Sequence, residues 1–174
     1  MIKEEFIKLL ENCGAIQFGR FTLRSGAISD YYIDIKKAST NPNILKTIAK
    51  AMADYTNGYD ILAGMELGAV PLVVAVSLET NIPYVIIRKE KKEHGTGKQI
   101  EGGEIKGKRV LIIEDVTTSG GSVIKSIQVI RENQGIVDEV LAVVDRESGA
   151  EKKMKELDVS FIPLLSVSEF LKKK

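Results

Sequence analysis

Two adjacent carboxylates stand beside a run of hydroxyl and glycine residues in stretch 110–122, which reads Val-Leu-Ile-Ile-Glu-Asp-Val-Thr-Thr-Ser-Gly-Gly-Ser. Glycines accept positive φ, so the backbone amides of residues 117–122 can point at one spot just before a helix expected to begin at about Ser122. Amide nests and helix N-termini of this kind bind phosphate. Glu114 and Asp115 at the edge of that spot suit hydroxyl groups or a cation. A phosphorylated sugar meets both demands.

The simpler interpretation of this stretch is a strand-to-helix turn whose Thr and Ser residues only cap the helix. The glycines alone favour that interpretation, and the acidic pair favours an anion site. Two commoner nucleotide motifs are excluded. A P-loop needs a Lys directly after its last glycine, and Gly121 is followed by Ser122. A dinucleotide fingerprint needs a third glycine where Ile100 follows Gly95-Thr96-Gly97.

A second group of charged residues, 88–95, reads Arg-Lys-Glu-Lys-Lys-Glu-His-Gly and contains the only histidine of the chain. Such a run is most often a solvated, self-neutralising surface segment. It follows a short apolar segment at 84–87, however, and ligands of open α/β sheets bind outside the carboxyl ends of the strands. A cationic loop that closes over an anion is therefore the alternative interpretation.

The elements that must position these residues alternate between strand and helix. Residues 110–113 are apolar at every position, which is typical of a parallel strand covered on both faces. Further strands are expected at 60–63, 84–87, 137–144 and 159–164. Helices are expected at 41–55, 69–78, from about 122, at 147–157 and at 166–171. This alternation predicts an α/β fold, an open and mostly parallel sheet flanked by helices with right-handed crossovers.

The N-terminal part of the chain has a different pattern. A short amphipathic helix is expected over residues 2–13, followed by strands at 18–23 and 31–35 with a turn between them. The length of 174 residues predicts one domain. We expect residues 1–40 to form a small hood and residues 41–174 the core, with a flexible loop at 88–107.

Composition limits the function classes. Apolar residues make up 44% and charged residues 28%, as in ordinary globular proteins, and a net charge of +1 gives no basic field for nucleic acid. The single cysteine, Cys13, excludes intramolecular disulfides and cysteine metal clusters. The chain lacks the apolar core of a signal peptide and any apolar run near the ~20 residues of a membrane span. We therefore expect a cytoplasmic protein without a membrane or nucleic-acid partner.

Stretch 110–122 resembles the phosphoribosyl-pyrophosphate (PRPP) signature of type I phosphoribosyltransferases. The spacing Arg-Lys-x-x-Lys-x-His-Gly at 88–95 resembles the flexible catalytic loop of orotate phosphoribosyltransferases. Segment 21–26 (Phe-Thr-Leu-Arg-Ser-Gly) and Asp145-Arg146 complete four matches in the order of that family. The resemblance covers nearly the whole chain.

This resemblance implies transfer of the 5-phosphoribosyl group from PRPP to orotate, which gives orotidine 5'-monophosphate and pyrophosphate in pyrimidine biosynthesis. It implies Mg²⁺ as cofactor, held mainly by PRPP, with no direct side-chain ligand and with Asp115 in contact through water. It also implies a homodimer in which loop 88–95 is shared across the interface.

The family resemblance also assigns roles to individual residues. The catalytic residues it implies are Lys92, His94 and Asp115. The PRPP contacts it implies are Arg88, Lys89, Lys92, His94, Glu114, Asp115, Val116, Thr117, Thr118, Ser119, Gly120, Gly121 and Ser122. The orotate contacts it implies are Arg24, Tyr31, Tyr32, Thr118 and Arg146.

Physical reasoning agrees with this assignment. Ribosyl transfer passes through an oxocarbenium-like state, in which positive charge grows on the sugar and negative charge on the departing pyrophosphate. Carboxylates near the sugar stabilise the positive charge, and cations near the leaving group stabilise the negative charge. The planar carboxylate of orotate suits the guanidinium of Arg24 or Arg146, and its ring suits a tyrosine face. The simpler alternatives are surface charges for the arginines and strand packing for Tyr31 and Tyr32.

The sequence departs from the family pattern at two positions. Leu67 stands where many relatives carry a Lys before the second glycine of their pyrophosphate loop, with Glu66 beside it. Arg24 replaces a common Lys and keeps the charge but changes its geometry. The chain also lacks a fused decarboxylase domain, so we expect the reaction to stop at orotidine monophosphate.

Three rival functions remain. A purine phosphoribosyltransferase would share the PRPP turn, but such enzymes often carry a further acid where Thr117 stands. A regulator that binds PRPP without catalysis would need a nucleic-acid-binding element, for which 174 residues at net +1 leave no room. An inactive paralogue would not need Lys92 and His94.

Overall fold

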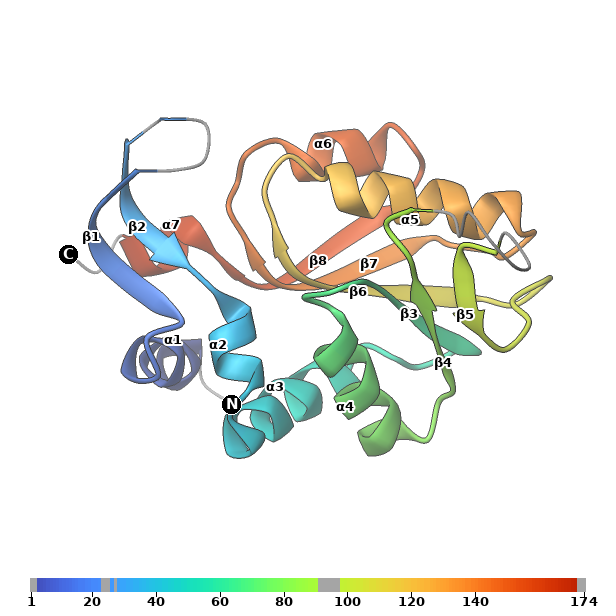
Figure 1. Ribbon diagram of the computed structural model, residues 1–174, viewed down its shortest axis with the longest axis horizontal. Helices are drawn as coiled ribbons and strands as arrows, with labels where there is room; N and C mark the ends of the chain where they lie inside the picture. The colour runs from blue at the N-terminus through green and yellow to red at the C-terminus, as the bar shows by residue number, and fades with distance from the viewer. Residues whose placement is uncertain (1–2, 23–25, 27, 91–97, 172–174) are drawn as a thin grey trace.

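The computed structural model describes residues 3–22, 26, 28–90 and 98–171. A six-stranded sheet in the order β5-β4-β3-β6-β7-β8 forms the centre of the molecule (Figure 1). Its strands are β3 (Ile61–Met65), β4 (Tyr84–Ile87), β5 (Ile100–Gly102), β6 (Val110–Thr117), β7 (Glu139–Asp145) and β8 (Ser160–Ser166). Neighbouring strands are parallel except β5, which is antiparallel to β4. The predicted open, mostly parallel sheet is confirmed.

The helices cover both faces of this sheet. They are α1 (Lys3–Asn12), α2 (Ile35–Ser39), α3 (Pro42–Ala53), α4 (Val70–Thr80), α5 (Gly121–Glu132), α6 (Ala150–Lys155) and α7 (Val167–Leu171). Figure 1 shows α5 and α6 on one side of the sheet, with α3 and α4 on the other. Every residue of β3 is buried, as expected for a strand between two helical layers.

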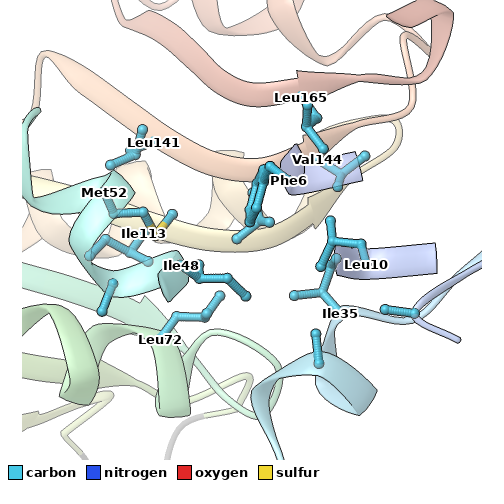
Figure 2. Packing of buried hydrophobic residues seen from close by; sticks show 14 of the residues in the cluster. Phe6, Leu10, Ile35, Ile48, Met52, Leu72, Ile113, Leu141, Val144 and Leu165 are labelled. Carbon is cyan, nitrogen blue, oxygen red and sulfur yellow. The ribbon is translucent and has the colours of Figure 1, made fainter. Parts of the chain in front are cut away.

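Each layer has its own apolar core. The first joins α1, α2, α3 and α4 to the sheet, and Figure 2 shows Phe6 and Leu10 in it beside Ile35, Ile48 and Leu72. The second lies between the sheet and the pair α5 and α6. Alternate residues of β6 point to opposite sides, so the strand contributes to both cores.

The N-terminal hairpin lies outside the main sheet, as predicted. Strands β1 (Ile16–Thr22) and β2 (Ile28–Ile33) pair antiparallel in a sheet of their own. Helix α7, near the other end of the chain, packs against them through Phe170, whose ring meets Phe18 and Tyr31 edge to face. The last helix therefore joins the hairpin to the core (Figure 1).

Several boundaries differ from those expected. Strand β6 continues to Thr117, which pairs with Asp145, so Glu114 and Asp115 lie within the strand instead of after it. Helix α6 begins only at Ala150 because Glu147 (φ 52°) and Gly149 (φ 92°) adopt left-handed conformations that a right-handed helix excludes. Within the charged stretch 88–107 the short edge strand β5 forms. In the described part of the chain, no helix has the length and apolar character that a membrane span requires.

Candidate functional site

The hydroxyl-rich turn forms a hollow at the carboxyl edge of the sheet. Helix α5 begins at Gly121 and Gly120 before it has φ 77°, a conformation that favours glycine. Among the described residues no side chain caps this helix end, so its first amides remain available to a ligand. The hollow has a volume of about 190 Å³ and is lined by Glu114, Val116, Thr117, Thr118, Ser119, Gly120, Gly121, Ser122 and Val123.

Glu114 lines this hollow, and Asp115 is the next residue of β6. Glu114 is only 6% exposed, and its burial, followed by its contact with Asp115, raises the pKa of the Glu114 carboxyl well above its ordinary value. The Asp115 N–H donates to Glu114 Oε1 over 3.0 Å, and the Val116 N–H donates to Asp115 Oδ1 over 2.8 Å. These bonds hold the two carboxyl groups close to the backbone of β6.

The glycine loop after β3 meets the acidic pair directly. A Cβ added to Gly68 would lie 2.1 Å from Asp115 Oδ2, so only glycine fits there without a shift. Leu67, in contrast, is 72% exposed, and the peptide bond before it is cis. The loop between β3 and α4 and the turn between β6 and α5 therefore belong to one site.

Thr117 has a structural contact that the sequence did not reveal. It is 2% exposed, and its hydroxyl donates to Asp145 Oδ1 over 3.0 Å. Burial raises the pKa of Asp145, whereas hydrogen bonds from the Glu147 N–H and from Thr117 lower it. The Thr117 hydroxyl is thus directed at β7, while Thr118 and Ser119 are exposed at the hollow.

The first two cations of the 88–95 stretch lie at the end of β4, beside the acidic pair. The charge of Lys89 lowers the pKa of Glu114, opposing the effect of burial. Arg88 forms an ion pair of 3.6 Å with Glu101. Lys92 and His94, the predicted catalytic residues of this stretch, lie outside the described residues.

The residues predicted around orotate are brought together only in part. The guanidinium carbon of Arg146 lies 5.1 Å from the centre of the Tyr31 ring, and its buried Nε has no hydrogen-bond partner among the described residues. Tyr32, the next residue of β2, points to the other side of the strand and packs on Phe21 with ring centres 5.6 Å apart. Arg24 lies outside the described residues.

Two further side chains reach this site without having been predicted. Lys153 of α6 donates to the carbonyl of Ser119 over 3.0 Å, and Glu66 accepts the Lys89 N–H over 2.8 Å. Both contacts join elements far apart in the sequence. The sequence carries no signal for them, because they depend on how the helices and loops pack.

The chain matches the family model described as phosphoribosyl transferase domain over residues 35–170. It is 51% identical to orotate phosphoribosyltransferase of Pyrococcus horikoshii, covering 98% of this chain and 94% of that one. It is 50% identical to the Methanothermobacter thermautotrophicus enzyme of the same name, covering 97% and 94%.

Solved structures agree with these relatives. The crystal structure of orotate phosphoribosyltransferase from Aeropyrum pernix matches with a TM-score of 0.86 and 30% identity, covering 99% of this chain and 97% of that one. The Mycobacterium tuberculosis orotate phosphoribosyltransferase in complex with PRPP matches with a TM-score of 0.79 and 27% identity, covering 96% and 97%.

Proposed function

Because the chain belongs to the orotate phosphoribosyltransferase family, we propose that it transfers the 5-phosphoribosyl group from PRPP to orotate in pyrimidine biosynthesis. The products are orotidine 5'-monophosphate and pyrophosphate. The observation that carries this proposal is the hollow in front of α5, where an uncapped helix end and the carboxyl group of Glu114 face the same space, with Asp115 as the next residue of β6. This combination suits a sugar phosphate, since the amides bind the phosphate and the carboxyl groups bind hydroxyls.

The turn would bind the 5'-phosphate of PRPP. The contacts proposed here are Glu114, Asp115, Val116, Thr117, Thr118, Ser119, Gly120, Gly121 and Ser122. Since the Thr117 hydroxyl already donates to Asp145, we assign phosphate binding to the exposed hydroxyls of Thr118, Ser119 and Ser122 and to the turn amides. The carboxyl groups of Glu114 and Asp115 would face the ribose hydroxyls.

The leaving pyrophosphate would meet Arg88, Lys89, Lys92 and His94. As the bond between ribose and pyrophosphate breaks, positive charge grows on the sugar and negative charge on the leaving group. Asp115 on the sugar side and the cations on the other side stabilise both charges. Lys92, His94 and Asp115 are the residues to which we assign catalysis.

Orotate would lie between the hairpin and the core. The Nε of Arg146 has no hydrogen-bond partner among the described residues, so this guanidinium can donate to the orotate carboxylate. The Tyr31 ring already packs against the guanidinium of Arg146. Arg24 and Thr118 are further proposed contacts, and a contact from Tyr32, which lies on the other side of β2 from Tyr31, stays a prediction from the sequence. Residues 1–40 would act as the hood over the base, and residues 41–174 as the core of a single domain with a flexible loop at 88–107.

Magnesium is the proposed cofactor. The described residues contain no group of three or more His, Cys, Asp or Glu side chains that could hold a metal ion alone. Mg²⁺ usually keeps several waters and binds through one or two carboxylates together with substrate phosphates, and the acidic pair beside the hollow fits that chemistry. When bound with PRPP, it would neutralise phosphate charge, and Asp115 would contact it through water.

A homodimer is the proposed assembly. Helix α4 is apolar on nearly all sides, and Leu78 on it is 78% exposed, as is usual for a helix that packs against a second subunit. Sharing of loop 88–95 across that interface and the cytoplasmic location stay predictions from the sequence.

One assay tests the proposed reaction. Purified protein with Mg²⁺, PRPP and orotate should consume orotate, which is followed by the loss of its ultraviolet absorbance. Turnover of hypoxanthine or guanine in its place would overturn the assignment and favour the purine enzymes. Binding of PRPP without turnover of any base would favour a regulator.

A further inference from the structure

The peptide groups around Lys89 are held from three directions. The Lys89 N–H donates to Glu66 Oε1 over 2.8 Å, and the Lys89 carbonyl accepts from Lys125 Nζ. The side-chain amide of Gln99 donates to the carbonyls of Arg88 and Lys89 over 2.9 and 3.5 Å. Gln99 is 9% exposed, so its contacts are shielded from water. The start of the 88–95 stretch is therefore fixed by side chains from three separate segments.

Two of these segments, those of Glu66 and Lys125, also belong to the anion site. Glu66 belongs to the glycine loop whose Gly68 lies against Asp115, and its own N–H is bound to the carbonyl of Ile87. Lys125 lies in α5, one turn after the helix end that opens on the hollow. The glycine loop and the PRPP turn thus meet at the backbone of Lys89.

Glu66 is an unexpected residue in this place. A carboxylate beside a phosphate-binding site repels the ligand and lowers its affinity. Its presence there is explained only if the carboxylate has a second role. The contact with the Lys89 N–H supplies that role. A carboxylate accepting an N–H forms a stronger hydrogen bond than a neutral acceptor, and here it fixes the backbone of Lys89, a cation just after the end of β4.

We propose that Glu66 is a positioning residue, which holds the Lys89 backbone so that the Lys89 ammonium group is directed at the PRPP site. Gln99 and Lys125 support the same arrangement through the Arg88 and Lys89 carbonyls. The inference rests on the proposed function, because it assumes that PRPP is the ligand. A cation that is already fixed in place loses less entropy when the anion binds, which increases the affinity. This increase disappears when the backbone of the cation is no longer held.

The experiment compares Glu66→Ala with Glu66→Gln. Alanine removes the acceptor, whereas glutamine keeps an acceptor oxygen of nearly the same shape. We expect Glu66→Ala to raise both the Kd of PRPP, measured by titration with Mg²⁺ and without orotate, and the KM of PRPP by about tenfold, the loss of roughly one charge-assisted hydrogen bond. The KM of orotate should stay within about twofold, and Glu66→Gln, which keeps a weaker, neutral acceptor, should lose clearly less PRPP affinity than Glu66→Ala.

A double-mutant cycle tests whether Glu66 acts through Lys89. In a Lys89→Ala background, Glu66→Ala should cause little further loss of PRPP affinity, because the cation it positions is gone. Glu104→Ala, which removes an exposed carboxylate between β5 and β6, is the matched control and should leave PRPP binding unchanged. Thermal unfolding of each variant checks that the fold is retained.

The outcomes separate this inference from the proposed reaction. Tighter PRPP binding in both Glu66 variants would mean that the residue only repels the ligand and would overturn the inference. So would equal losses in Glu66→Ala and Glu66→Gln, or full additivity with Lys89→Ala. If the wild type binds PRPP but does not consume orotate, the proposed reaction fails, while the PRPP titrations still decide the role of Glu66.

Discussion

Glu114 places a carboxyl group at the edge of the sheet, where it is largely shielded from water. Burial disfavours its charged form, and the neighbouring Asp115 adds to that effect. Lys89 acts in the opposite direction. A neutral Glu114 can donate a hydrogen bond to a ribose oxygen, whereas a charged one can only accept, so its protonation state decides which contact the sugar receives.

The first prediction concerns the pH dependence of stability. Because the pKa of Glu114 is higher in the folded protein than the 4.5 of an unperturbed group, its contribution to stability is fully present below pH 4.5. That contribution is lost as the pH rises through the folded pKa. Glu114→Gln cannot ionise, so its free energy of unfolding relative to the wild type should increase as the pH rises from 4.5 through the folded pKa of Glu114.

Urea denaturation of the ligand-free protein at several pH values measures this difference. Asp115→Asn is the comparison variant, since Asp115 is only partly buried. A constant difference between Glu114→Gln and the wild type across the pH range would show that Glu114 does not have a raised pKa.

Helix α6 supports the PRPP turn from behind. The Lys153 ammonium group donates to the carbonyl of Ser119, a residue that lines the hollow, and so holds one peptide group of the turn in place. Lys153→Met keeps the aliphatic chain and removes the donor. We expect the KM of PRPP to rise about fivefold, which corresponds to the ~1 kcal/mol of a typical hydrogen bond, with little change in stability.

Steady-state kinetics at varied PRPP measures this effect. Lys155→Met, also exposed and on the same helix, provides the matched control. If both variants have the same KM of PRPP as the wild type, α6 has no part in shaping the turn.

Helix α7 joins the hairpin to the core through one aromatic side chain. Phe170 is 1% exposed and meets Phe18 and Tyr31 with ring centres 6.2 and 6.1 Å away. Tyr31 in turn holds Arg146. Phe170→Ala should therefore lower the free energy of unfolding by about 3–5 kcal/mol, the usual cost of emptying a buried aromatic site.

The same variant should act unequally on the two substrates. At temperatures where it stays folded, the KM of orotate should rise more than the KM of PRPP, because the hairpin carries orotate contacts and the hollow lies on the core sheet. Leu171→Ala, at a 39% exposed neighbour, should change neither. Equal increases in both KM values would mean that α7 stabilises the whole molecule without positioning the hairpin.

The elements were predictable wherever local signals agreed. The Asn41-Pro42 signal marks the start of α3, where the Asn41 side chain accepts from the N–H groups of Asn43 and Ile44, and the apolar run at 84–87 is strand β4. The predicted boundaries were wrong where contacts with a neighbouring element set the end of a strand or helix. The end of β6 is set by its ladder with β7, and hydrophobic periodicity contains no information about how far that pairing extends.

The site was predictable in part for the same reason. A contiguous motif such as 114–122 brings its residues together at one strand end and turn, and in the structure all of them except Asp115 line one hollow. Contacts between distant segments, such as Thr117 with Asp145 or Glu66 with Lys89, require the register of the sheet and the packing of loops. Successive side chains of β2 point to opposite sides, so Tyr31 and Tyr32, which were predicted to act together, are separated.

At the scale of the whole molecule, the exposed apolar side chain of Leu78 on α4 is the basis for the proposed dimer. Leu67, just before α4, is 72% exposed, and Leu78, near the end of α4, is 78% exposed. The net charge of +1 gives little repulsion between copies of the chain. A second copy that packs on this surface would form an isologous dimer. We therefore expect a solution mass of twice 19.1 kDa by sedimentation equilibrium.

The last prediction links this assembly to catalysis. Leu78→Glu places a charge on the proposed interface and should shift the protein to a monomer, whereas Ile136→Glu, at a 50% exposed site between α5 and β7, should stay a dimer. If residues 88–95 are shared between subunits, the monomer should still bind PRPP at the turn but lose most of its kcat, because the leaving-group cations beyond Lys89 would come from the partner. A fully active Leu78→Glu monomer would contradict the sharing, and a variant that remains dimeric would place the interface elsewhere.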